Sequence, residues 1–301
     1  LYYGGNKLHR SLDKGDHWET ISPDLTNGGK KGNVPYGTLT TISESVLKFG
    51  LLYTGSDDGL IHFSKDGGVK WELISSSLPK DLWISRVVAS SHKEGRVYTT
   101  LNGYRWDDFS PYVYVSDDYG NTWKSINSNL PFSPLNVIIE DPVSENILYV
   151  GNDNGVYVSF DMGQSWEPFS KGLTSAAVHD LVIQEKENHL VVGTHGRSIY
   201  VADISNIQKA DANFLKKPLH FFEIKHVNHS KNWGNKRSSW VTPNIPSLEL
   251  FFYNKTTSIY DLIIKNKQGI VLNKISGKLE FGFSKINYHL SINENGRLTY
   301  N

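Results

Sequence analysis

The sequence predicts an all-β protein made of β-propeller blades, followed by a small antiparallel β module. Three observations predict this fold. The pattern S-x-D-x-G-x-x-W occurs four times, at residues 11–18, 64–71, 116–123 and 159–166. Successive copies start 53, 52 and 43 residues apart, close to the repeat length of propeller blades. Each copy lies between short apolar, β-rich runs that are typical of strands.

The residue types of the motif predict a tight corner between two antiparallel strands. Ser and Asp side chains bond nearby backbone N–H groups, Gly supplies positive φ, and Trp anchors the next strand by burying a large ring. A catalytic residue is usually needed once, whereas this motif recurs in every unit, so we interpret it as structural. Its residues are Ser11, Asp13, Gly15, Trp18, Ser64, Asp66, Gly68, Trp71, Ser116, Asp118, Gly120, Trp123, Ser159, Asp161, Gly163 and Trp166.

The strands expected around these corners form five sets. The first set lacks its innermost strand, and the fifth has neither the motif nor an outer strand. The expected strands are 1–5, 7–11 and 18–21; 38–42, 51–55, 60–64 and 71–75; 84–89, 96–101, 112–116 and 123–126; 135–140, 147–151, 155–159 and 166–169; and 178–183, 189–193 and 198–202.

The motif resembles the Asp box, or BNR repeat, of sialidases, sortilin (Vps10) propellers and xyloglucanase-type propellers. The phrases LYYGGNKLHRSLDKGDHW, LNGYRWDDFSPYVYVSDDYGNTW and VVGTHGRSIYVADIS also resemble secreted bacterial proteins described as glycosyl hydrolases or sortilin-like. The resemblance covers residues 1–204 and implies a seven-bladed ring. We therefore expect upstream blades in a longer parent protein of a bacterium, located outside the cell, at its surface or in the periplasm.

The rest of the chain divides into two further segments. Residues 205–245 are expected to be a linker or wrapping segment. Residues 246–301 alternate between apolar and polar side chains, which predicts a small antiparallel module, either whole or in part. By resemblance, this module is immunoglobulin-like.

Composition excludes several classes of partner. The formal net charge is zero, so no bulk attraction to nucleic acid is expected. No apolar run is long enough for a membrane helix. The chain has no cysteine, its histidines are scattered, and it carries no P-loop or dinucleotide fingerprint. We therefore expect neither a metal nor a cofactor.

The segment Asn102–Tyr112 is the most informative candidate for a site, because it is longer than the corresponding turns of the other sets. It carries Tyr104, Arg105 and Trp106 as candidate binding residues. Asp107 and Asp108 are weak catalytic candidates, since a carboxylate pair can perform glycosidase chemistry. Adjacent carboxylates on one loop do not flank a bond, however, so a structural role for both remains open.

Other candidate binding residues lie in the turns between the second and third strands of other sets. They are Asp57, Asp58, His195 and Arg197. In a propeller these turns share one face with the connections between sets, whereas the Asp boxes lie on the opposite face. The alternative is that they simply form tight turns, with Gly196 at positive φ.

Three hypotheses about function follow. The first is a secreted or cell-surface scaffold that binds a protein or glycan through the loops of one face. The second is a glycoside hydrolase whose catalytic carboxylates lie partly outside this chain. The third is a subunit of a cell-envelope assembly. The sialidase arginine triad is not recognisable here, which leaves the enzyme hypothesis without a complete catalytic set.

Overall fold

The structure, a computed structural model, divides the chain into two compact units, Leu1–Lys209 and Ala210–Asn301. We describe each unit by itself. The boundary falls inside the segment 205–245 that was expected to be a linker. The described residues are 1–28, 37–173, 175–210, 212–224, 226–228, 230–236, 238–243 and 246–290, so the last part of the expected β module, 291–301, lies outside them.

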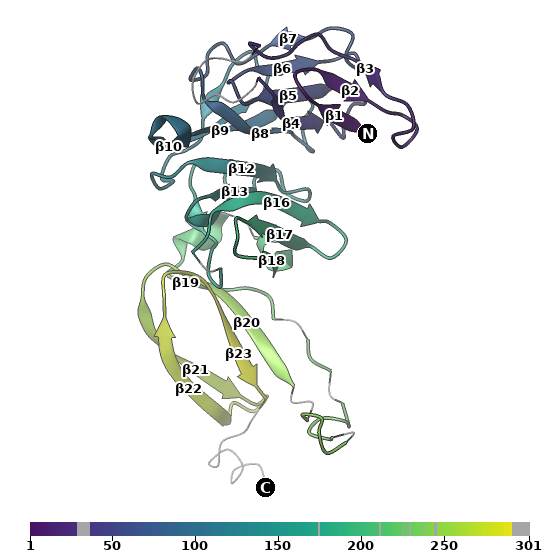
Figure 1. The fold of residues 1–301 in the computed structure, drawn as a ribbon. Helices are drawn as coiled ribbons and strands as arrows, with labels where there is room; N and C mark the ends of the chain where they lie inside the picture. The colour runs from purple at the N-terminus through teal and green to yellow at the C-terminus, as the bar shows by residue number, and fades with distance from the viewer. Residues whose placement is uncertain are drawn as a thin grey trace. The chain divides into compact units, whose positions relative to one another are not determined.

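The described residues of the first unit form five antiparallel sheets whose strands are consecutive in the chain (Figure 1). The first sheet has β1 (Tyr2–Gly4), β2 (Leu8–Arg10) and β3 (Glu19–Thr20). The second has β4 (Leu39–Glu44), β5 (Leu52–Ser56), β6 (Ile61–Ser64) and β7 (Glu72–Leu73). The third has β8 (Trp83–Ala89), β9 (Val97–Gly103), β10 (Asp108–Ser116) and β11 (Lys124–Ser125). The fourth has β12 (Leu135–Glu140), β13 (Leu148–Asn152), β14 (Gly155–Ser159) and β15 (Glu167–Pro168).

The fifth sheet has three strands, β16 (Val178–Gln184), β17 (His189–Thr194) and β18 (Ile199–Asp203). A short helix, α1 (Ser205–Gln208), follows β18 where the other sheets have the S-x-D-x-G-x-x-W motif. We call this motif the Asp box, after the repeat that it resembles. Ile207 of α1 is buried, and Gln208 Nε2 donates to Asp141 Oδ2 at 3.1 Å. The predicted all-β fold is confirmed, since the unit consists of successive small antiparallel sheets.

The core of the first unit lies between successive sheets. Between the second and third sheets, Tyr53 stacks on Phe63 with ring centroids 5.9 Å apart, and both belong to a buried cluster with Ile84 and Leu101. Similar clusters lie between the first and second sheets and between the third and fourth. Burial of these apolar faces holds neighbouring sheets together.

Each Asp box forms the same hydrogen-bonded corner. In the fourth copy, Ser159 Oγ donates to Asp161 Oδ1 at 2.8 Å and accepts from Gly163 N at 2.8 Å. Asp161 Oδ1 also accepts from Ser165 N at 2.8 Å. The other three copies repeat this set of bonds. The Ser and Asp side chains therefore serve to fold the turn.

The tryptophan of the box joins neighbouring sheets. In three copies its indole N–H donates to a carbonyl at the end of the preceding outer strand: Trp71 to Ile21 at 2.9 Å, Trp123 to Ile74 at 2.8 Å and Trp166 to Ile126 at 2.7 Å. The same isoleucines lie against the glycine of the box. A Cβ on Gly163, whose φ is +83°, would lie 2.8 Å from Ile126. Glycine is therefore required for both backbone conformation and close approach.

In the part of the second unit that the structure describes, there are two small antiparallel sheets. One has β19 (Leu219–Phe221), β20 (Ser247–Asn254) and β23 (Gly282–His289); the other has β21 (Ser258–Lys265) and β22 (Val271–Leu279). A 3-10 turn, η2 (Ala212–Lys216), supplies the buried Phe214, whose ring contacts those of Phe222 and Tyr253. Because β19 pairs with β20, residues of the expected linker belong to this unit.

Candidate binding face

In the second and fifth sheets, the turn between the second and third strands lies beside the connection that leads into the first, innermost strand of the sheet. Asp57 N donates to Thr38 O at 2.9 Å, just before β4. Likewise, His195 N donates to Ala177 O at 2.8 Å, just before β16. The Asp boxes instead contact the turns that follow inner strands; Met162 N, for example, donates to Asn146 O at 3.0 Å. We call the face that carries the turns between second and third strands, and the connections into the innermost strands, the loop face.

The turn between β9 and β10 is built around a 3-10 turn, η1 (Tyr104–Trp106). Among the described residues of the first unit, β9 and β10 are the longest second and third strands of any sheet. Asn102 is buried at the end of β9, where its Oδ1 accepts from Tyr104 N at 3.0 Å. Asp107 ends η1 in the left-handed conformation, with φ +56°. The indole N–H of Trp106 donates to Asp81 O at 3.0 Å in the connection before β8. These bonds tie the turn to the sheet and to the neighbouring connection.

An exposed aromatic cluster surrounds this turn. Tyr104, Trp106 and Phe109 all expose large parts of their rings, and Phe132 from the connection before β12 is mostly exposed. The rings of Phe109 and Phe132 lie 6.3 Å apart. The guanidinium of Arg105 lies 5.3 Å from the Trp83 ring and 5.8 Å from the Tyr104 ring. We call Trp83, Tyr104, Arg105, Trp106, Phe109 and Phe132 the aromatic cluster.

Sequence reasoning placed Tyr104, Arg105 and Trp106 together but did not include Phe132. A signal was present, because Phe132 lies between Pro131 and Pro134 in a connection where no strand is expected. A large apolar residue in such a connection is either buried beneath it or exposed for contact. The structure exposes it.

The two adjacent carboxylates of this turn have different surroundings. Asp108 accepts hydrogen bonds from Ser110 N at 3.0 Å and from the Tyr112 hydroxyl at 2.7 Å. Burial acts to raise the pKa of Asp108, but these hydrogen bonds outweigh it and lower the pKa. A general acid needs the opposite shift. Asp108 is therefore placed as an ionised acceptor, while the Asp107 side chain is exposed.

Asp57 and Asp58 are buried in the turn between β5 and β6. Asp57 Oδ1 accepts from Thr38 N at 2.8 Å. Asp58 accepts from the Ser56 hydroxyl at 2.5 Å and from Asn27 N at 2.7 Å. Both carboxylates thus bond backbone and side-chain groups of the fold, and their burial leaves little surface for a ligand.

His195 and Arg197 are exposed in the turn between β17 and β18. The His195 ring lies 5.2 Å from that of His179, which sits at an irregularity in the pairing of β16 with β17. The neighbouring Asp180 forms an ion pair of 2.6 Å with Arg86 of β8. Inner strands of the third and fifth sheets are thereby linked, and the exposed His195 and Arg197 remain accessible from solvent.

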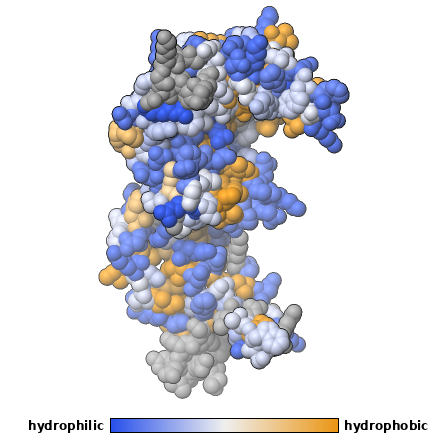
Figure 2. Space-filling model, viewed as in Figure 1, coloured by the Kyte–Doolittle hydropathy of each residue, from blue (hydrophilic) through white to orange (hydrophobic). Residues whose placement is uncertain are grey.

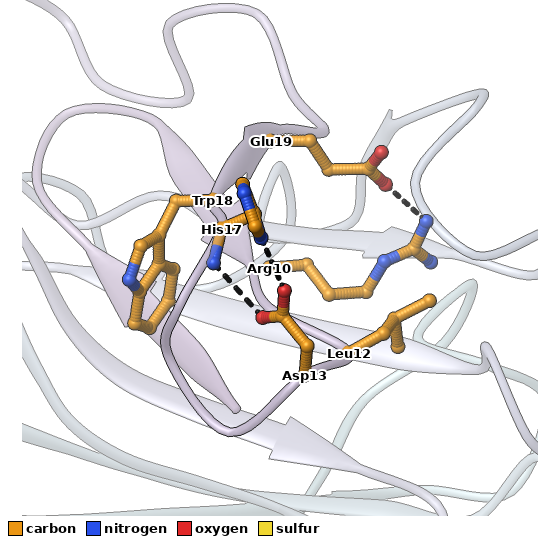
Figure 3. Close-up of a pocket in the computed structure, with 6 residues that line it drawn as sticks. All are labelled: Arg10, Leu12, Asp13, His17, Trp18 and Glu19. Atoms are coloured by element: carbon orange, nitrogen blue, oxygen red, sulfur yellow. Dashed lines mark hydrogen bonds and ion pairs between the residues drawn. The ribbon is translucent and has the colours of Figure 1, made fainter.

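A shallow pocket of about 300 Å3 lies at the first Asp box, away from the loop face (Figure 3). It is lined by Arg10, Leu12, Asp13, His17, Trp18 and Glu19. His17 Nδ1 lies 2.6 Å from Asp13 Oδ2, where the fourth box has the Ser165 hydroxyl on Asp161 at 2.6 Å. Because the two contacts correspond, the His–Asp pair completes the turn.

Within the described residues, no group of three or more His, Cys, Asp or Glu side chains could hold a metal ion. No helix in the same part of the chain is long and apolar enough to cross a membrane. On the visible face of the first unit, apolar residues occur in separate groups among polar ones (Figure 2).

No protein-family model and no curated protein matches the chain. Solved structures do resemble it. The GH74 xyloglucanase from Xanthomonas campestris has 12% identity and a TM-score of 0.52, over 93% of this chain and 42% of that one. The Niastella koreensis GH74 enzyme has 14% identity and a TM-score of 0.51, over 65% and 32% of the two chains. YCF48 bound to a D1 peptide has 16% identity and a TM-score of 0.43, over 65% and 58%.

This chain therefore spans less than two thirds of each of these three proteins. At such low identity, the two GH74 structures show a common fold and nothing more. Taken with the succession of three- and four-stranded antiparallel sheets, they establish the fold of the first unit as that of a β-propeller.

Proposed function

We propose that the first unit is a propeller scaffold that binds a protein or glycan partner through its loop face. The observation that carries the proposal is the aromatic cluster, which exposes several large rings on one face. Exposed aromatic side chains cost solvation free energy unless a partner covers them. Trp, Tyr and Arg are also the residue types that contribute most to binding when they are buried at an interface.

The cluster is prepared for binding because its backbone is fixed. Hydrogen bonds hold Tyr104 to Asn102 and the Trp106 indole to Asp81, so little conformational entropy is lost on binding. Its flat rings fit the apolar face of a sugar ring or an apolar peptide side chain. Carboxylates near the cluster or on the same face, such as Asp108 and Asp58, are engaged within the fold. This arrangement favours binding over catalysis.

The test uses a glycan array and a displayed peptide library to find ligands of the whole chain. Trp106→Ala and Phe132→Ala should each weaken the selected ligand at least about tenfold, as expected for central interface aromatics. Val69→Ala is the control, because Val69 is an apolar residue at least as exposed as Trp106 and Phe132 but belongs to the second Asp box. If the control weakens binding as much as the two aromatic variants do, the loop face is not the binding surface.

A glycoside hydrolase is the second candidate, and the exposed Asp107 beside the aromatic cluster favours it. In this version, the partner carboxylate lies outside the chain. Asp107→Asn should then abolish release of sugar from a polysaccharide by the parent protein, and Asp108→Asn should impair it. Unchanged turnover in both variants would exclude this site.

We further propose that the protein acts outside the cell, at the cell surface or in the periplasm. The absence of cysteine is compatible with an oxidising compartment. Fractionation of the source cells would test the location. Membership of a cell-envelope assembly predicts co-purification with fixed stoichiometry from the envelope fraction. Recovery of the protein only from the soluble interior of the cell would contradict both proposals.

A further inference from the structure

One face of the first sheet is unusually apolar and exposed. Side chains alternate across a strand, and Tyr2 points toward the second sheet, where its hydroxyl bonds Glu44. Leu1 and Tyr3 therefore point the other way, and the Trp18 ring joins them 6.3 Å from the Tyr3 ring. Leu1 is 64% exposed, Tyr3 66% and Trp18 47%. We call these three residues the leading face.

The corresponding residues of the next three sheets are buried. Tyr53, Tyr98 and Tyr149 occupy the position of Tyr2 in β5, β9 and β13, so the residues on either side of each correspond to Leu1 and Tyr3. These counterparts are Leu52 and Thr54, Val97 and Thr99, and Leu148 and Val150, and all six are 0% exposed. In each case the preceding sheet supplies the cover. The leading face is thus one side of an interface that the chain forms three times elsewhere.

The Asp-box corner shows the same difference. Trp71, Trp123 and Trp166 each donate to the carbonyl of an isoleucine in the preceding outer strand. In the described part of the chain, the Trp18 indole donates to Gly15 O of its own turn at 3.0 Å. A Cβ on Gly15 would meet nothing closer than 3.7 Å, whereas the other three box glycines have an isoleucine atom or carbonyl within 2.4–2.8 Å.

The sequence indicates which kind of segment would contact Gly15 and Trp18. From each box tryptophan onward, the chain reads W-x-x-(I/F)-(S/N)-x-x-L: WETISPDL at 18–25, WELISSSL at 71–78, WKSINSNL at 123–130 and WEPFSKGL at 166–173. In three of the four segments, the fourth residue is the isoleucine that contacts the next box. The same segment from another blade would fit over Gly15 and Trp18.

We propose that the leading face receives a further Asp-box blade, whose outer strand ends in W-x-x-I. The isoleucine carbonyl accepts the Trp18 indole N–H, and its side chain covers Gly15. The proposal rests on continuity with the three interfaces already present. A second copy of this chain is a poor occupant, because Ile74 and Ile126 are already buried against their own partners. This interface is separate from the loop face and independent of the proposed function.

The chain offers its own probe for a test. Residues 38–96 comprise the second sheet, β8 and the turn after β8. The residue that follows this segment is Val97, which is the counterpart of Leu1. A copy of 38–96 fused before Leu1 should therefore dock on the leading face. Since the chain has no cysteine, Tyr3→Cys introduces a single thiol at a position where the counterparts are Thr and Val. Docking should slow its labelling by a thiol reagent about tenfold or more.

Two controls make the result specific. Phe132→Cys, on the loop face, should label equally fast with and without the fused blade. Aspartate in place of the copied Ile74 should restore fast labelling at Tyr3→Cys. Labelling that stays fast in the fused protein would overturn the proposal. So would concentration-dependent protection of the unfused chain, which would identify a second copy as the occupant.

Discussion

The substitution Trp166→Phe tests whether the Asp-box tryptophans stabilise the propeller by joining its sheets. Trp166 is 1% exposed, and its indole N–H donates to Ile126 O at 2.7 Å. Phenylalanine keeps one aromatic ring but removes the donor and the pyrrole part of the indole. The carbonyl of Ile126 then loses a partner in a buried position.

The expected loss of stability has two parts. Roughly 40 Å2 less apolar surface is buried, which at about 25 cal/mol per Å2 amounts to about 1 kcal/mol. A buried carbonyl without its donor costs about 1–3 kcal/mol. Together they give about 2–4 kcal/mol for Trp166→Phe. At Trp18 the ring is half exposed and its acceptor can bond water, so Trp18→Phe should cost only about 0.5 kcal/mol.

Calorimetry and urea unfolding followed by far-UV circular dichroism would measure both variants. For a unit of this size, Trp166→Phe should lower Tm by about 5–10 °C. Trp18→Phe provides the matched control, because the motif is the same and only the preceding sheet differs. Equal losses from the two substitutions would refute the reasoning, since the tryptophan would then act only within its own turn.

Three further predictions concern single contacts. Gly163→Ala should destabilise the first unit by about 2 kcal/mol or more in urea unfolding, because the strain of positive φ adds to the clash with Ile126. Gly15→Ala should cost less, because no isoleucine lies against Gly15. An equal cost for the two substitutions would contradict the packing argument. Hydrogen bonds from the His17 backbone and ring lower the pKa of Asp13 to about 2 from 3.8. Its contribution to stability is therefore complete above about pH 4 and lost as pH falls through about 2, so an Asp13→Asn variant should show a smaller decline in an acid titration of Tm. Phe214→Ala should destabilise the second unit by about 3–5 kcal/mol, seen as faster proteolysis of residues 210–301 with the first unit intact.

Much of the fold could be predicted because the corner is encoded locally. The Ser, Asp and Gly of each Asp box bond within eight residues, so one short pattern specifies the whole turn. The strand expected at 135–140 coincides with β12, and the one expected at 155–159 coincides with β14. The strand expected at 112–116 was too short. β10 begins at Asp108, because Asp108 already pairs with Gly103 of β9, ahead of an irregularity at residues 109–111.

Contacts between sheets could not be predicted in this way. Ile126 looks like an ordinary strand residue, and only the structure shows it lying against Gly163. Asp57 and Asp58 looked like exposed turn residues because acidic turns usually are exposed. Their burial depends on Thr38 and Asn27, which lie 19 and 31 residues away in the chain.

The Asp-box end and the loop face of the sheets therefore differ in how well they tolerate amino-acid substitution. At the Asp-box end, the Ser, Asp and Trp side chains bond within the turn or to the neighbouring sheet, and Gly supplies positive φ and close approach, so substitution costs stability. At the loop face, the acidic side chains of the turn in the second sheet also bond within the fold, since Asp57 and Asp58 are buried and hydrogen-bonded. In the third sheet, where β9 and β10 are longer than the corresponding strands of the other sheets, Tyr104 and Trp106 are large side chains that are exposed at the end of the hairpin. Specificity for a partner should therefore reside in the third sheet. Replacing the extended end of the β9–β10 hairpin with the shorter end of the β5–β6 hairpin should remove binding while leaving the five sheets intact.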